Sequence, residues 1–409
     1  MKNNSNSIES SHAVAFAVAE KANSSSIQDV LTQAKQLAGD SMAEAAATDS
    51  TDKFPAETFQ KIAKAKLLSA PLPRELGGIG LGLENGTTLE MLQLLKHFGR
   101  GNLVVGRVYE GHYNALLLLK LFGTKEQFQK YAKEIVEDNK IFGVWNTEAG
   151  DGVKIEPLGS DKYRLEGAKT FATGVDFVSR PFVNGVLPDG GWQMCVVPLE
   201  KVETKVDASW WQPMGMKSTR SFRVDFSGVE LTENDLIGKA GDYYCQPYFS
   251  GGAVRFAAVQ LGAAEAIFDE TRKYLRELNR TGDPFQQMRL GEMAIAVEGG
   301  NLWLAGAARK FDEYEKNSTE EASEKFLAYA NMMRTAVAEI CETMMNLCVK
   351  CVGARGLNKP YHFERIIRDL TIYLRQPAPD ASLAAVGDYV LKNEKMNDEF
   401  WQNSRRINE

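Results

Sequence analysis

Apolar residues recur at helical spacing on both sides of a middle region that has a different pattern. From residue 27 to about residue 140 they stand three or four positions apart, as in IQDVLTQAKQLA and TTLEMLQLLKHFG, and this spacing predicts amphipathic helices. From residue 141 the segments become short, rich in β-branched and aromatic residues, and separated by turn residues, which predicts strands. Helical spacing returns after about residue 251. The pattern therefore predicts an α+β fold in which a β domain lies between two helical regions.

The last helical region contains long amphipathic segments. Examples are VRFAAVQLGAAEAIFDETRKYLREL and SEKFLAYANMMRTAVAEICETMMNLCVKCV, and the final segment starts at Asp380. Alanine and glycine stand where neighbouring helices would touch, which favours an antiparallel four-helix bundle. We therefore expect a polar, flexible N-terminus (1–26), an N-terminal helical domain (27–140), a middle β domain (141–245) and a C-terminal helical bundle domain (246–409).

The composition narrows the class of protein. The chain of 409 residues is 44% hydrophobic and 25% charged, as in ordinary globular proteins. Its net charge of -6 argues against a nucleic-acid partner, and the lack of an apolar run of about 18 residues argues against membrane insertion. Five cysteines, an odd number, indicate a reducing compartment and hence a cytoplasmic protein. Cys348 and Cys351 stand in a helical pattern and the histidines show no i, i+4 pairing, so we expect no metal site.

A series of short motifs occurs along the chain in a fixed order. LPRELGGIGLG lies in the first helical region, VWNTEAGDG and KTFATG lie in the β region, QPMGMKSTRSFRVDFSGVELTENDLIG closes that region, and VGARGL and RIIRDLTIYL follow in the last helical region. Together they resemble the motifs of the acyl-CoA dehydrogenase family, and the resemblance covers nearly the whole chain from about residue 27. It implies an N-terminal α-helical domain, a middle β-barrel-like domain and a C-terminal four-helix bundle. It also implies FAD as the cofactor and a homodimer or homotetramer that completes the cofactor site across subunits.

The resemblance assigns residues of the β region to the flavin ring. Thr147 would contact the pyrimidine edge, and Trp145 stands in the same stretch. Phe171 and Thr173 would lie against the ring near its reactive nitrogen. A flavin ring needs an apolar wall and a few hydrogen bonds to its polar edge, and these residue types supply both. The alternative is that they are ordinary strand residues, because β-branched and aromatic types favour strands in any case.

By the same resemblance, further residues would bind the part of the cofactor beyond the flavin ring, and they would come from a neighbouring subunit. By resemblance, Arg280 lies near the arginine that reaches the pyrophosphate, a task that suits a fixed charge with forked donors. Gly353 and Gly356 match a glycine-rich turn that lets the backbone approach the dinucleotide, and Lys350 would face a phosphate. The alternative for Arg280 is a solvated helix end.

The chain departs from the family at the position of the catalytic base. Oxidation of an acyl thioester removes a proton next to the carbonyl, which needs a carboxylate within hydrogen-bond reach. Most relatives carry a glutamate shortly after the RDLTIY-like segment, where this chain has Pro377. Others carry it before an arginine of the first bundle helix, where Val254 precedes Arg255. The acidic residue that remains nearby is Asp380, which is a candidate both for a relocated base and for the N-cap of the last helix; the two roles do not exclude each other.

Different functions therefore stay open. The main hypothesis is an FAD-dependent oxidoreductase acting on CH–CH groups, an α,β-dehydrogenase whose acyl thioester is carried by CoA or by a carrier protein, with Asp380 as the base and an electron-transfer partner. CoA itself is in doubt, because TEAGDGVKIEP lacks the serine that touches the CoA arm in many relatives. The alternative is a flavin-dependent monooxygenase on the same fold, which uses oxygen to hydroxylate nitrogen or carbon and needs no such base. A further alternative is a non-catalytic member of the family.

Overall fold

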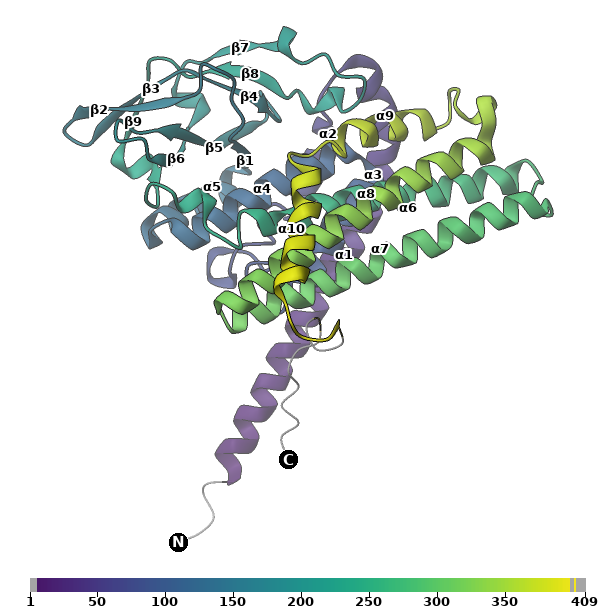
Figure 1. Cartoon of the computed structure of the whole chain (residues 1–409). Helices are drawn as coiled ribbons and strands as arrows, with labels where there is room; N and C mark the ends of the chain where they lie inside the picture. The colour runs from purple at the N-terminus through teal and green to yellow at the C-terminus, as the bar shows by residue number, and fades with distance from the viewer. Residues whose placement is uncertain (1–5, 398–400, 402–409) are drawn as a thin grey trace.

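Helices come first along the chain. The structure is a computed structural model that describes residues 6–397 and residue 401, with side chains described from residue 27 onward. The first helical region comprises α1 (Asn6–Thr51), α2 (Ala56–Lys64), α3 (Thr88–Gly101), α4 (Leu103–Phe122) and α5 (Lys125–Asp138). α1 begins inside the segment that we expected to be flexible (Figure 1), and residues 1–5 of that expectation lie outside the described residues.

Local capping explains why some of these helices begin where they do. Thr124 and Gln127 form a capping box at the start of α5, in which the Thr124 hydroxyl accepts from the Gln127 backbone N–H at 3.2 Å and Gln127 Oε1 accepts from the Thr124 backbone N–H at 2.9 Å. Asn102 caps α4 by accepting from the Val104 N–H at 3.0 Å. Both arrangements satisfy backbone donors that the first helical turn leaves free.

Strands follow next along the chain and form two sheets, which lie to one side of the helices (Figure 1). The larger sheet has the order β10-β6-β5-β2-β3-β9 with β1 pairing parallel to β5, and the smaller has the order β4-β8-β7. The strands are β1 (Ile141–Trp145), β2 (Lys154–Gly159), β3 (Lys162–Glu166), β4 (Ala168–Ala172), β5 (Val178–Val186), β6 (Trp192–Val196), β7 (Lys205–Asp207), β8 (Phe222–Asp225), β9 (Val229–Thr232) and β10 (Leu236–Ile237). This is the β region that the change of pattern at residue 141 predicts.

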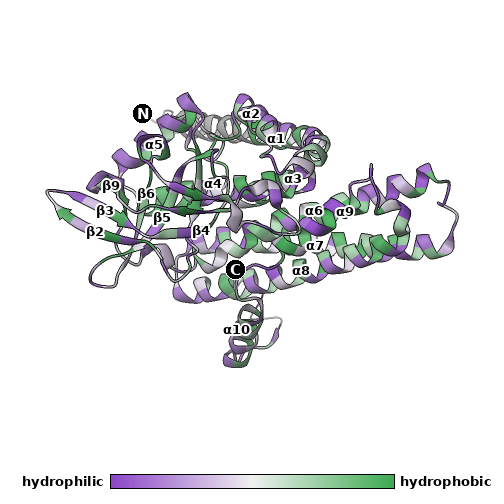
Figure 2. Cartoon of the chain, turned by 90° about the horizontal axis from the view of Figure 1, so that it is seen from above, coloured by the Kyte–Doolittle hydropathy of each residue, from purple (hydrophilic) through white to green (hydrophobic). Residues whose placement is uncertain are grey.

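The C-terminal region is built on three long helices, α6 (Ala253–Glu277), α7 (Pro284–Lys316) and α8 (Glu320–Gly356), which pack against one another. α9 (Phe363–Tyr373) packs on α6 and α8. α10 (Pro379–Lys392), expected as the fourth long segment of the bundle, packs on α8 and projects from the layer that the other helices form (Figure 2).

Glycines allow the first helical region to approach the bundle closely. A Cβ atom on Gly99 of α3 would lie 2.0 Å from the carbonyl oxygen of Val259 in α6, and a Cβ atom on Gly262 of α6 would lie 2.0 Å from the carbonyl oxygen of Lys96 in α3. The Lys96 ammonium also pairs with Glu265 at 2.7 Å. The two helices therefore meet backbone to backbone, and their crossing joins the two helical regions.

Arg368 and Asp369 of α9 join the β region to both helical regions. The Arg368 guanidinium donates to Asp49 of α1 at 2.7 Å and to the carbonyl oxygen of Met214 at 3.0 Å. The Asp369 carboxylate accepts from the backbone N–H of Met216 at 2.5 Å. This joint fixes α9, and with it the chain that continues from α9 toward α10.

The cysteine pair lies inside α8. Cys348 and Cys351 are both buried, which confirms the prediction that they are small hydrophobic residues of a helix. Among the residues that the structure describes, no group of three or more His, Cys, Asp or Glu side chains could hold a metal ion. Within the same residues, no helix combines the length and the apolar character that crossing a membrane requires.

Candidate functional site

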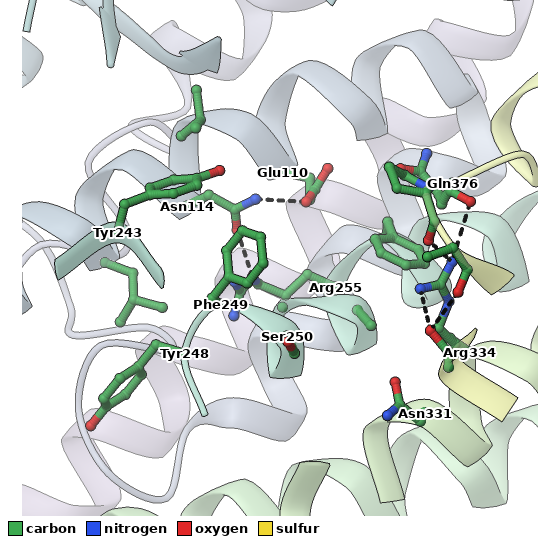
Figure 3. A pocket seen from close by; sticks show the side chains of 18 of the residues that line it. Glu110, Asn114, Tyr243, Tyr248, Phe249, Ser250, Arg255, Asn331, Arg334 and Gln376 are labelled. Carbon is green, nitrogen blue, oxygen red and sulfur yellow. Dashed lines mark hydrogen bonds between the residues drawn. The ribbon is translucent and has the colours of Figure 1, made fainter. Parts of the chain in front are cut away.

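A cavity of about 500 Å³ lies where α4, the start of α6, α8 and the segment around Pro377 meet (Figure 3). Much of its wall is apolar, with leucines from α4 and aromatic rings from Tyr243, Phe249 and Phe256. Its polar wall comes from a few side chains, labelled in Figure 3. An apolar cavity with a few fixed polar groups is the usual form of a small-molecule site.

A carboxylate that the sequence did not point to lies in this wall. Glu110 of α4 is 4% exposed, and its Oε2 accepts from Arg107 Nη1 at 2.7 Å. Its Oε1 accepts from Asn114 Nδ2 at 2.6 Å, and the Tyr373 hydroxyl donates to Oε2 at 3.4 Å. Asn114 Oδ1 in turn accepts from Arg255 Nε at 2.5 Å. Glu110 is therefore a carboxylate committed to partners on α4 and α9.

The resemblance aligns Pro377 and Val254 with the family's two base positions. Pro377 lines the cavity, and Val254 is buried at the start of α6. Asp380 is exposed in the first turn of α10 and is not among the residues that line the cavity. The prediction that Asp380 caps α10 is wrong, because the helix begins at Pro379 and its N-cap is Ala378 in a left-handed conformation with φ 53°.

The structure does bring the four residues assigned to the flavin ring together. Trp145 Nε1 donates to the carbonyl oxygen of Thr173 at 2.9 Å. The Thr170 N–H donates to the carbonyl oxygen of Thr147 at 2.8 Å, so the end of β1 runs beside β4. Phe171 adopts a left-handed φ of 52°, and its ring is 47% exposed. Thr147, Phe171 and Thr173 therefore lie close together beside β4, and the buried Trp145 ring holds Thr173 from within.

Two tryptophans that the sequence reading missed lie beside Phe171. The Phe171 ring lies edge-on to Trp210, with centroids 4.7 Å apart, and to Trp211, with centroids 5.7 Å apart. The adjacent WW pair in the sequence was the available signal. Trp211 Nε1 is buried and has no hydrogen-bond partner among the described residues, although an indole N–H usually finds one.

A chain of hydroxyl groups lies behind Thr173. Thr173 Oγ1 is 3.0 Å from Ser221 Oγ, which is 2.7 Å from Thr219 Oγ1. Thr219 Oγ1 donates to the carbonyl oxygen of Met216 at 2.7 Å. All three hydroxyl residues are buried, so the Thr173 side chain is held in one position.

These features fit a flavin ring. The exposed Phe171 ring offers an aromatic wall, Trp211 Nε1 has no hydrogen-bond partner within the described part of the chain, and Thr173 offers a fixed hydroxyl. An aromatic heterocycle with a polar edge needs this combination of groups.

The residues assigned to the rest of the cofactor lie elsewhere. Arg280 stands in the turn between α6 and α7, at the end of the bundle that points away from the β region (Figure 1). Its guanidinium lies 3.4 Å from Asp283 and is partly exposed. Lys350 is exposed on α8. Within one chain the structure does not bring these two residues to Phe171 and Thr173, and the resemblance assigns them to the site of a neighbouring subunit.

The two glycines of the VGARGL motif differ in role. Gly353 interrupts α8 with φ 60° and ψ -168°, and a Cβ atom there would meet nothing within 4 Å. The backbone at Gly353 is therefore open to an approaching group. Gly356 is buried, and a Cβ atom there would lie 2.3 Å from the Val352 side chain, so this glycine serves packing within the helix end.

Comparison with known proteins extends over most of the chain. Residues 24–139 match the family model "Acyl-CoA dehydrogenase, N-terminal domain", and residues 254–375 match "Acyl-CoA dehydrogenase, C-terminal domain". The 3-(aryl)acrylate reductase of Clostridium sporogenes is 28% identical over 79% of this chain and 87% of its own length. The dibenzothiophene monooxygenase of Mycolicibacterium goodii is 22% identical over 82% of this chain and 87% of its own length.

A solved structure shares the fold. The FMN-bound dibenzothiophene monooxygenase of Paenibacillus sp. A11-2 superposes with a TM-score of 0.82 at 20% identity, covering 91% of this chain and all of that one. This confirms the predicted order of N-terminal helices, a middle β half-barrel and a C-terminal helical domain. Because both family models match in the family's own order and the fold agrees, the chain belongs to the acyl-CoA dehydrogenase family of flavoproteins.

Proposed function

We propose that this chain is a flavin-dependent monooxygenase. The proposal rests on one observation: among the described residues that line the cavity, none is an uncommitted carboxylate. By the resemblance, Pro377 stands at one base position and Val254 at the other. Asp380 lies outside the cavity lining, and Glu110 is tied to Arg107. Abstraction of an α-proton from a thioester needs a free carboxylate within reach, whereas oxygenation does not. The monooxygenases among the similar proteins support the same choice.

The chain's own residues supply binding, orientation and exclusion of water in this reaction. When bound, a reduced flavin supplies the electrons that activate oxygen. Phe171, Trp210 and Trp211 form the aromatic wall on the β side, and the Thr173 hydroxyl is fixed for a polar edge. The apolar walls of the cavity keep bulk water from the substrate, which limits wasteful side reactions.

Anaerobic titration with acyl thioesters tests this proposal. Butyryl-, octanoyl- and cinnamoyl-CoA should leave the absorption spectrum of the oxidised holoprotein unbleached. The reduced holoprotein, mixed with ¹⁸O₂ and a panel of indoles, aryl sulfides and aryl or alkyl sulfinates, should place one labelled oxygen atom in a product. Rapid bleaching by a thioester, with no labelled product from the panel, would show a dehydrogenase instead.

Dehydrogenation is a second candidate because Glu110 does lie in the cavity wall. In that case Glu110 would take the place of the missing base, and Glu110→Gln would abolish bleaching by whichever thioester bleaches the wild type. Asp380→Asn is the matched control. It removes a carboxylate from the same region of the chain, but Asp380 does not line the cavity. Equal bleaching in both variants would remove Glu110 from consideration.

The form of the flavin is part of the proposal. The assignment of FAD rests on the ordered motifs WNTE, KTFATG and VGARGL. Arg280 and the open backbone at Gly353 would then receive a dinucleotide from a neighbouring subunit. The FMN-bound neighbour makes FMN the alternative. Acid release followed by chromatography decides between them, and Arg280→Gln should lower the affinity for FAD while leaving that for FMN unchanged.

A further inference from the structure

The charged side chains that line the cavity are two arginines and one glutamate, namely Arg255, Arg334 and Glu110. Glu110 is already paired with Arg107 at 2.7 Å. The arginines therefore leave the wall of an otherwise apolar cavity with an excess of positive charge. A buried charge is costly unless a partner of opposite sign meets it.

Arg255 has unused donors. Its Nε donates to Asn114 Oδ1 at 2.5 Å, which fixes the plane of the guanidinium, but neither Nη atom makes a hydrogen bond within the described part of the chain. Gly252 leaves room for this group, because a Cβ atom there would lie 2.6 Å from Arg255 Nη2. Burial lowers the pKa of Arg255, and the nearby Tyr113, Glu110 and Tyr243 offset this only in part. The guanidinium remains charged, because arginine does not deprotonate in proteins.

Arg334 of α8 is the second cation. Its Nη1 donates to Ser382 Oγ at 2.9 Å and its Nη2 to the carbonyl oxygen of Pro377 at 3.0 Å, both of which are neutral acceptors. Burial lowers its pKa, and no carboxylate among the described residues raises it again. Figure 3 shows Arg255 and Arg334 on different elements around the same cavity.

We propose that the substrate of this cavity carries an anionic head group, a carboxylate or its sulfinate or sulfonate counterpart, on an apolar body. The Nη atoms of Arg255 bind the head group, and Arg334 adds a second positive charge to the wall. The planar fork of a guanidinium matches the paired oxygens of such groups. The leucines of α4 and the rings of Phe249 and Phe256 cover the apolar body. This inference names the substrate class for the cavity of the proposed function.

Binding of matched probes to the holoprotein tests the inference without turnover. Isothermal titration is made with octanoate, heptane-1-sulfonate and octanamide, which share a heptyl chain; the first two carry an anionic head group and the third a neutral one. The anions should bind about ten- to a hundredfold more tightly than the amide, as expected for charge-assisted hydrogen bonds. Equal affinity of octanoate and octanamide for the wild type would overturn the proposal by itself.

Variants then assign the preference to residues. Arg255→Gln should remove most of the preference for the anion and Arg255→Lys should restore part of it, while Arg334→Gln should weaken it less. Arg272→Gln is the matched control, because Arg272 lies on the same helix and pairs with Asp269 at the surface. A preference that survives in both Arg255→Gln and Arg334→Gln would overturn the assignment. Should Arg255→Gln not fold, the wild-type probes and Arg334→Gln still decide. Even if the protein proves to be a dehydrogenase, it should still bind the anionic probes more tightly than the amide. The binding test of the head group can therefore fail without the test of the reaction failing, and the reverse.

Discussion

Replacing Gly262 by alanine should separate the two helical regions. An added Cβ atom would lie 2.0 Å from the carbonyl oxygen of Lys96, where 3.4 Å is ordinary contact. The obstacle is backbone and cannot rotate away, so α3 and α6 must move apart by more than about 1 Å. That movement also stretches the ion pair between Lys96 and Glu265, now 2.7 Å long.

Two opposing contributions determine how Gly262→Ala changes the free energy of unfolding. Alanine in place of glycine inside a helix gains about 0.5–1 kcal/mol from backbone entropy. Forcing extra volume into a packed contact costs about 1–3 kcal/mol or more. Gly262→Ala should therefore lower the free energy of unfolding by about 1–2 kcal/mol. Gly39→Ala is the matched control, because Gly39 is also helical, is exposed on α1, and would meet nothing within 4 Å.

Denaturant unfolding of both variants, followed by circular dichroism at one protein concentration, measures the difference. Gly39→Ala should be as stable as the wild type or slightly more stable, and Gly262→Ala less stable. The double variant Gly99→Ala with Gly262→Ala should lose less than the sum of the single losses, because one separation of the helices relieves both contacts. A Gly262→Ala protein as stable as Gly39→Ala would refute the close crossing.

Other predictions concern pH, assembly and Asp380. His112 is fully buried, its Nδ1 accepts from the Phe142 N–H at 3.1 Å, and burial lowers its pKa from 6.5 to about 4. Because burial depresses the pKa of His112 in the folded state, the neutral imidazole contributes fully to stability above pH 6.5. The free energy of unfolding then falls by about 3 kcal/mol at most as the pH falls toward 4. Denaturant titrations across that range should show a smaller loss in His112→Gln. Leu302 on α7 is apolar and 65% exposed, so we expect it to meet a second copy of the chain, and Leu302→Glu should lower the mass found by light scattering. Asp380→Asn should change neither stability nor activity, and a large loss of activity would restore Asp380 as the base.

The order of elements could be predicted from the chain because it depends on local periodicity. The change from helical to alternating spacing near residue 141 coincides with the first residue of β1. The start of α10 could be predicted to within one residue, because the pattern places it at Asp380 and the helix begins at Pro379. The cap and the packing of α10 could not be predicted in this way. Its N-cap is Ala378, which adopts a left-handed conformation between two prolines, and its packing on α8 is a long-range contact that its own pattern does not specify.

In the candidate site, too, some residues could be predicted from the sequence and others could not. Trp145, Thr147, Phe171 and Thr173 lie in motifs that can be compared one by one, and their proximity was expected. Glu110 was missed because one acidic residue in an apolar helix gives no sign of its partners. The link from Asn114 to Arg255 spans 141 residues, and no spacing rule reaches so far along one sequence.

The hydroxyl chain behind Thr173 has a direction. A carbonyl oxygen can only accept, so the hydrogen of Thr219 is committed to Met216. Ser221 then gives its hydrogen to Thr219, and the hydrogen of Thr173 goes either to Ser221 at 3.0 Å or to the carbonyl oxygen of Phe171 at 3.4 Å, since each hydroxyl has a single hydrogen. Toward the exposed surface Thr173 is left with lone pairs alone. A ring atom that meets it there has to bring its own hydrogen, and for a cofactor that gains a proton on reduction this polarity favours the reduced form.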